Sequence, residues 1–181
     1  MSGHAVLPRV TRALEVVTRQ AGQAVAWLVL PMVAGLVYEV VARYLFNAPT
    51  TWAYDMTYML YGTCFMVGSA WTLQRGGHIR TDTFYANWSP RTKAIVDIAC
   101  YLLFFFPAIA IFMVLGWEYF WKSFQQNERI VTSPWLPIVW PFKFVIPATG
   151  ALLLLQGVAE VLKALPAALG RDANGAAESA K

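Results

Sequence analysis

The stretch Tyr101–Trp121, with the sequence YLLFFFPAIAIFMVLGWEYFW, decides the fold class of this chain. Glu118 is its only charged residue. The apolar pattern starts near Lys93, and a helix over residues 93–121 would be roughly 40 Å long. Because this length exceeds the roughly 30 Å hydrocarbon core of a bilayer, we expect the helix to cross a membrane with a tilt or to project beyond it. Pro107, in its middle, is expected to kink it.

The composition of the whole chain agrees with a membrane location. Of its 181 residues, 58% are hydrophobic and only 13% are charged, whereas about 25% of the residues in a typical soluble domain are charged. A chain of this length has too much surface for its volume to hide so much apolar area in a soluble fold. Backbone polar groups in lipid must pair within each segment, so we expect an all-α membrane protein.

Three further apolar runs predict spanning helices over residues 24–46, 52–73 and 142–163. Proline and glycine separate these runs, because the residue before a proline is pushed out of the helical region and paired glycines end a helix. We therefore predict a domain of four transmembrane helices over residues 24–163.

The two ends of the chain differ from this domain. Residues 1–23 contain apolar side chains at helical spacing between arginines, which predicts an amphipathic helix over residues 7–20 on the cytoplasmic membrane surface. Prolines within residues 134–141 predict a broken entry to the last helix. Residues 164–181 are rich in alanine and glycine, and we expect a disordered cytoplasmic tail.

The distribution of lysine and arginine predicts the topology. The net charge of +4 could suggest a nucleic-acid partner, but no basic stripe is present, and cytoplasmic loops of membrane proteins collect positive charge. Four of the 14 basic residues fall on one predicted side, namely Arg43, Lys122, Arg129 and Lys143. The other ten fall on the opposite side, which the positive-inside rule places in the cytoplasm with both chain termini.

Charged residues near the predicted outer surface are the first candidate functional groups. Glu39 and Arg43 are four residues apart with the acid first, the favourable order for an ion pair on one helix face. Glu118 and Lys122 repeat this spacing. Asp55 follows a short turn, and we expect it to share a polar cluster with Arg43 or Trp52, or else to cap its own helix.

A small polar turn over residues 75–82 is the candidate on the cytoplasmic side. It could dock another subunit or anionic lipid, or it could be a solvated turn that fixes orientation. His78 is the only histidine near the membrane, so the chain lacks the histidine pair that would hold a haem between helices. Cys64 and Cys100 lie in apolar runs without metal-ligand spacing. No catalytic constellation is visible, and we expect no enzymatic activity and no cofactor.

Several of these motifs occur together in an order that resembles a known family. They are Val41-Ala42-Arg43-Tyr44-Leu45-Phe46-Asn47, then Trp52, Asp55 and Gly68, then Arg75-Gly76-Gly77-His78-Ile79-Arg80-Thr81-Asp82, then Ser133-Pro134-Trp135-Leu136-Pro137, Lys143, Ile146-Pro147 and Leu152-Leu153-Leu154-Leu155-Gln156-Gly157. The chain resembles, over roughly residues 24–163, the small membrane subunit (DctQ type) of TRAP transporters, the tripartite ATP-independent periplasmic transporters.

This resemblance implies a subunit of the bacterial inner membrane. Its partners would be a large permease subunit (DctM type) and a periplasmic solute-binding protein (DctP type) that delivers an organic acid for sodium-driven uptake. The family places the substrate and sodium sites in the large subunit, so the small one would be a scaffold. Structural or subunit-interface roles are then expected for Glu39, Arg43, Trp52, Asp55, Gly68, Arg75, His78, Arg80, Asp82 and Lys143.

Close packing is the role expected of Gly68, which follows Cys64 and precedes Thr72 at four-residue spacing, because small side chains let membrane helices approach one another. Two other classes of function remain open. The chain could be an autonomous small transporter with Glu39 as a proton-coupled group, or the membrane anchor of a redox complex. The sequence does not specify which organic acid is carried.

Overall fold

The computed structural model describes residues 6–76 and 88–170, and these are almost entirely helical, as predicted. The elements, in chain order, are α1 (Val6–Ala26), α2 (Val29–Leu45), α3 (Ala53–Gln74), α5 (Pro90–Cys100), a π-helical turn η1 (Tyr101–Phe105), α6 (Phe106–Gln126) and α7 (Trp140–Ala168). His78, Arg80 and Asp82 lie outside the described residues, as do residues 171–181 of the predicted tail.

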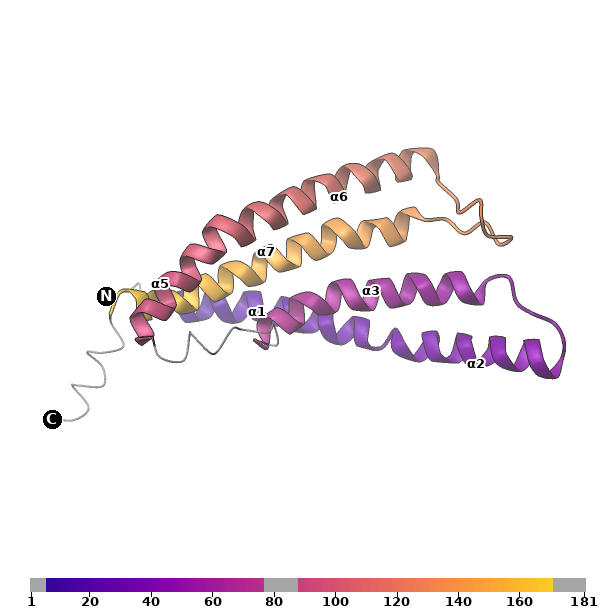
Figure 1. The fold of residues 1–181 in the computed structure, drawn as a ribbon, viewed down its shortest axis with the longest axis horizontal. Coiled ribbons are helices and arrows are strands. Elements are labelled where there is room, and N and C mark those ends of the chain that lie inside the picture. The colour runs from indigo at the N-terminus through magenta and orange to yellow at the C-terminus, as the bar shows by residue number, and fades with distance from the viewer. Residues whose placement is uncertain (1–5, 77–87, 171–181) are drawn as a thin grey trace.

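The helices form an elongated bundle with two distinct ends (Figure 1). The turn between α2 and α3 and the connection between α6 and α7 lie at one end, which we call the hairpin end. The start of α1, the end of α3, the start of α5 and the end of α7 lie toward the other, which we call the basic end. In the middle, α3 contacts α1, α2 and α7, and α6 packs along α7.

Helix α1 is longer than the amphipathic helix predicted over residues 7–20. It extends to Ala26 and packs against α3 and α7, so it is not separate from the other helices. Only a short break at Trp27 and Leu28 separates it from α2, and the two follow one another along the bundle (Figure 1). Thr18, on the packed face of α1, is 1% exposed. Packing against two neighbours makes α1 part of the bundle.

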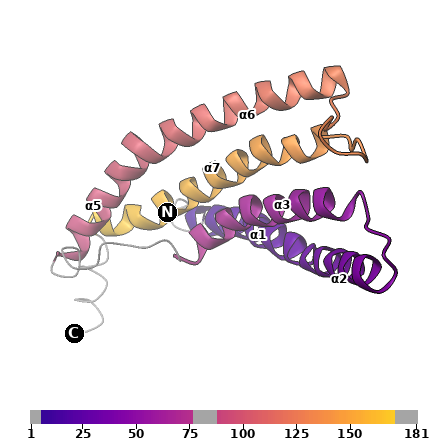
Figure 2. The same cartoon turned by 45° about the vertical axis from the view of Figure 1, so that its right-hand side comes forward.

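The predicted long helix is continuous from Pro90 to Gln126, longer at both ends than residues 93–121. The expected disturbance near Pro107 takes the form of the π-helical turn η1, in which the Phe106 amide donates to the Tyr101 carbonyl. A proline interferes with the carbonyl four residues before it, and the wider π turn relieves that conflict. The helix follows a smooth arch through this region (Figure 2).

The last helix is also longer than predicted. Helix α7 starts at Trp140 rather than 142, because Pro141 occupies a first-turn position where its missing amide is not needed. It continues past 163 through Pro166 to Ala168, so the first part of the predicted tail is helical. Before α7, residues 127–139 form a small hairpin with an antiparallel bridge between Arg129 and Ile138. The predicted broken entry is therefore confirmed up to residue 139, and it forms the second half of this 127–139 hairpin.

Side-chain burial in the bundle is inverted relative to a soluble protein. Large apolar residues such as Trp27, Leu103 and Phe104 are about 70% exposed, with fractions of 71%, 69% and 72%. Small or polar residues fill the interior instead, including Ala70 and Gln156, each 0% exposed. Such a surface would be unstable in water but is well solvated by lipid.

Within residues 6–76 and 88–170, three stretches are long and apolar enough to cross a membrane, namely Arg9–Leu45, Pro90–Gln126 and Trp140–Ala168. Helix α3, predicted as a fourth span over 52–73, is not among them. It is interrupted by tyrosine, threonine, serine and glycine, and it lies between three other helices. A helix in that position needs fewer apolar side chains than one that faces lipid on most sides.

The close contact between α6 and α7 generates a stability prediction. A Cβ atom at Gly150 would lie 2.9 Å from Met113 Cβ and 3.3 Å from Met113 Cα. The clash in the Gly150→Ala variant should cost about 1–3 kcal/mol of stability, and the higher helix propensity of alanine should offset part of this cost. The variant should therefore unfold at a lower temperature in detergent. Gly68→Ala is the matched control, because no atom lies within 4 Å of the new Cβ. Equal melting temperatures for the two variants would contradict the packing described here.

Candidate functional site

Glu39 is the centre of one polar cluster at the hairpin end. Its ion pair with Arg43 is confirmed, and the Arg43 Nε donates to Glu39 Oε1 at 2.8 Å. The second carboxylate oxygen accepts from the backbone amide of Thr50 at 2.8 Å and from the Thr50 hydroxyl. Asn47 permits the turn between them because asparagine tolerates the left-handed conformation, here with φ of 55°. The cluster thus ties the end of α2 to the turn that leads into α3.

Asp55 belongs to a different cluster from the one expected. Its carboxylate accepts a hydrogen bond from the Ser133 hydroxyl, and Ser133 Oγ accepts from the Trp135 amide at 3.2 Å. The partner is therefore Ser133 of the 127–139 hairpin, rather than Arg43 or Trp52. Trp52 instead stacks on Tyr38, with ring centroids 5.9 Å apart. Asp55 thereby joins α3 to a segment 78 residues later in the chain.

Lys143 is the most buried charged side chain of the described residues, and its residue is only 5% exposed. Its ammonium forms an ion pair with Glu128 and lies 3.8 Å from the centre of the Tyr119 ring. The hydrogen bond from Lys143 lowers the pKa of the Glu128 carboxyl. By contrast, no ion pair joins the described residues Glu118 and Lys122, so the spacing shared with Glu39 and Arg43 does not produce the same contact.

A second group of charges, which sequence reasoning missed, lies at the basic end. The Lys163 ammonium lies between two carboxylates, 2.5 Å from Glu15 and 2.8 Å from Glu160. The Gln156 amide also donates to Glu160, at 2.7 Å. The spacing between Gln156, Glu160 and Lys163 on one helix could have indicated this group, but nothing in the sequence pointed to Glu15 on α1. The contact links the first and last helices of the described chain.

The remaining candidates have less specific surroundings. The Arg75 guanidinium lies over the Trp71 ring at 4.3 Å, a cation–π contact at the end of α3. At Gly68, no atom of the described chain lies within 4 Å of the position that a Cβ atom would occupy, so this glycine does not produce close packing between described helices. The other candidates, His78, Arg80 and Asp82, lie outside the described residues.

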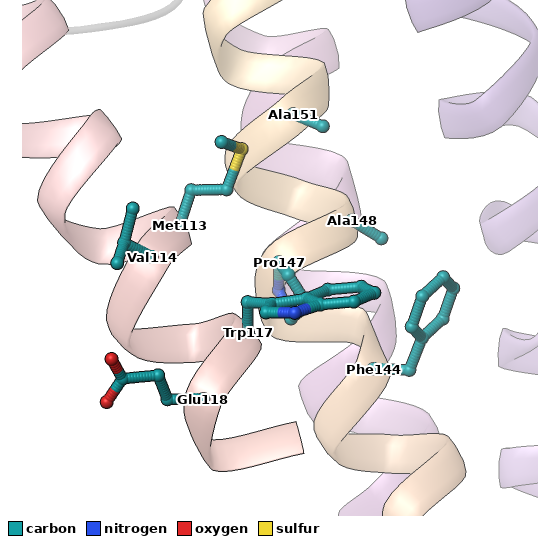
Figure 3. Close-up of a pocket in the computed structure, with 8 residues that line it drawn as sticks. All are labelled: Met113, Val114, Trp117, Glu118, Phe144, Pro147, Ala148 and Ala151. Carbon is teal, nitrogen blue, oxygen red and sulfur yellow. The ribbon is translucent and has the colours of Figure 1, made fainter. Parts of the chain in front are cut away.

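An apolar groove runs between α6 and α7 (Figure 3). It has a volume of about 560 Å³, and its lining includes Trp117, Phe144 and Pro147. Glu118 is the one charged residue in this lining, and its carboxylate points away from the Trp117 and Phe144 rings. Within residues 6–76 and 88–170, no group of three or more metal-ligating side chains is close enough to hold an ion. The groove offers an apolar surface and few groups that could coordinate a carboxylate.

A helical bundle with large apolar side chains outward and three stretches, within the described residues, that could cross a membrane defines the chain as a multi-pass membrane protein. Its residues 32–167 match the family described as "Tripartite ATP-independent periplasmic transporters, DctQ component". The match covers most of the chain, which therefore belongs to this family: it is a small permease component of a TRAP transporter. The family is not enzymatic, in agreement with the sequence-based prediction.

A curated relative supports this assignment. The chain is 19% identical, over 145 residues, to the sialic acid TRAP transporter small permease protein SiaQ of Vibrio cholerae. The alignment covers 79% of this chain and 80% of the relative. The similarity thus extends over nearly the whole of both proteins.

The ion pair of Glu128 with buried Lys143 predicts a pH dependence of stability. The pKa of Glu128 is lower in the folded protein than in the unfolded chain. The ion pair therefore contributes fully to stability above the unfolded pKa of about 4.3, and this contribution is lost as the pH falls through the folded pKa. Glu128→Gln should lower the stability at pH 7 by on the order of 1 kcal/mol. The difference between this variant and the unchanged protein should shrink below about pH 4.

Thermal unfolding in detergent, measured from pH 8 to pH 3, checks this expectation. Glu118→Gln serves as the control, because Glu118 has no ion pair among the described residues. A stability difference for Glu128→Gln that stays constant down to pH 3 would show that the ion pair does not contribute as described.

Proposed function

We propose that this subunit is the fixed scaffold of its transporter in the bacterial inner membrane. In this proposal it crosses the bilayer four times, through the helices predicted over residues 24–46, 52–73, 93–121 and 142–163, and both termini are cytoplasmic. It holds a large permease subunit of the DctM type. A periplasmic binding protein of the DctP type delivers an organic acid, and a sodium gradient drives its uptake through the large subunit.

The observation that carries the scaffold role is the internal engagement of acidic groups at the hairpin end. Glu39 is engaged by Arg43 and Thr50, Asp55 by Ser133, and Glu128 by Lys143. A carboxylate that coordinates a transported ion or proton must exchange partners during the cycle. These three instead join the helix ends to one another, which suits a part that keeps its shape while another part moves.

The charge distribution supports the proposed orientation. Seven of the basic residues assigned to the cytoplasm by sequence are described, and they lie on segments toward the basic end: Arg9, Arg12, Arg19, Arg75, Arg91, Lys93 and Lys163 (Figure 1). Arg43, Arg129 and Lys143 lie on segments that meet at the hairpin end (Figure 1). This separation suits a bundle with its basic end inside. Helix α3 would then cross between α1, α2 and α7 as the fourth span.

The family and the relative support an organic acid as the class of substrate, while the particular acid stays open. The relative's name specifies sialic acid, which is an organic acid. We extend only the chemical class to this chain, because the subunit would not contact the substrate itself. Trp52, Arg75 and Lys143 are then structural, and Gly68 offers space for a helix of the large subunit.

Reconstitution in vesicles tests the need for a partner. Vesicles with this chain alone should show no uptake of radiolabelled organic acid, because Glu39, Asp55 and Glu128 are engaged internally. Co-reconstitution with the large permease subunit, the binding protein and an inward sodium gradient should give uptake. If the chain alone carried the acid, and if Glu39→Gln abolished this uptake, the chain would be an autonomous transporter and not a scaffold.

The open surface at Gly68 gives a second prediction. Gly68→Leu should leave the isolated chain folded, since no described atom lies within 4 Å of the new side chain's first carbon. It should reduce co-purification with the large subunit by about tenfold, because a bulky residue keeps the helices apart. Leu155→Ala, on an exposed position of α7, is the control. Full assembly of the Gly68→Leu variant with the large subunit would show that Gly68 does not lie in the interface.

A further inference from the structure

A polar hollow at the basic end has no role in the scaffold described above. It lies between the first half of α1 and the end of α3 and has a volume of about 220 Å³. Its lining consists of Arg12, Glu15, Val16, Arg19 and Gln74. The four α1 residues recur at three- and four-residue spacing, so they share one face of the helix. Two guanidinium groups therefore border one small hollow.

The hollow carries excess positive charge. Glu15 is engaged by Lys163 at 2.5 Å, so its carboxylate is not free to neutralise the arginines. Arg12 and Arg19 form no ion pair with any described residue. Guanidinium groups bind phosphate oxygens through paired N–H donors, which makes a phosphate the matching anion.

Gln74 adds a requirement for a hydrogen-bond donor. Its Nε2 donates to the Glu15 carbonyl at 3.1 Å, which fixes the orientation of the amide. Its Oε1 is buried and accepts no hydrogen bond from the described residues. Buried carbonyl oxygens in proteins are nearly always paired, so a ligand that supplies an N–H or O–H would complete the site.

An apolar groove continues between α1 and α3 beyond the hollow, and its lining includes Gly22, Val25 and Trp71. The Trp71 ring packs against Gly22, one turn beyond Arg19, and carries the Arg75 guanidinium on its face. Arginines next to a tryptophan and an apolar groove are typical of the boundary between acyl chains and headgroups.

We infer that the hollow binds the headgroup of a phospholipid. Arg12 and Arg19 hold its phosphate, a hydroxyl or ammonium of the headgroup donates to Gln74 Oε1, and the acyl chains lie in the apolar groove beside Trp71. A soluble phosphate would satisfy the arginines but would leave this apolar groove unexplained. The site does not depend on the transport role, and it can be tested without the large subunit.

Native mass spectrometry of the full chain in detergent tests the site, with phosphatidylglycerol as the probe. Arg12→Gln/Arg19→Gln should weaken the first binding event at least about tenfold, since each basic residue near a lipid surface contributes roughly fivefold. The control Arg91→Gln/Lys122→Gln removes the same charge from exposed positions outside the hollow, and it should change binding less than twofold. If lipid binding weakened equally in both double variants, net charge alone would explain the attraction, and the proposed site would be wrong.

Two further comparisons use the unchanged protein, so they remain informative if the double variant does not fold. Phosphatidylglycerol should bind better than phosphatidylcholine, whose headgroup has no donor for Gln74. Equal affinity for the two lipids would overturn the donor contact. Inorganic phosphate at millimolar concentration should not displace the lipid. Displacement would mean that the hollow binds a soluble anion.

Discussion

The bundle depends on one constraint: a polar group placed in lipid must find its partner inside the protein. Unpaired backbone and side-chain groups in hydrocarbon cost several kcal/mol each, so the helices supply their own backbone partners and the charged side chains supply one another's. Lys143 shows the consequence most clearly. Its ammonium is buried three residues into α7, and it is stable there because Glu128 and the Tyr119 ring surround it. The 127–139 hairpin is shaped so that Glu128 can reach it.

The same constraint explains which parts of the fold the sequence could predict. Apolar runs reveal the helices, because their length and composition are set by the bilayer and not by any particular neighbour. The pair of Glu39 and Arg43 was predictable because both residues lie on one helix, where this spacing brings side chains within reach, although the described residues Glu118 and Lys122 share the spacing without forming a pair. The boundaries were less accurate. Pro107 and Pro141 were expected to kink or break helices, but the helices accommodate them through a π turn and a first-turn position, and α7 continues through Pro166.

Contacts between distant segments could not be predicted in this way. Asp55 pairs with Ser133, and Lys163 pairs with Glu15 in addition to Glu160 of its own helix. Neither Ser133 nor Glu15 lies on the helix of its partner. A single sequence shows that a charge needs a partner without showing which segment provides it. Helix α1 illustrates the same limit, since its alternation of arginine and valine suits a membrane surface equally well. Its packing on α3 and α7 depends on Thr18 and Gly22, two small residues whose significance appears only when Trp71 lies opposite.

The hydrogen bond between Asp55 and Ser133 has a mechanical consequence. Packing of α3 on α7 already joins the two helix pairs along the bundle. The hydrogen bond adds a polar link beyond the helix ends, where it fastens the 127–139 hairpin to the first turn of α3. A displacement of the hairpin is therefore transmitted to α2 and α3 as well as to α6 and α7.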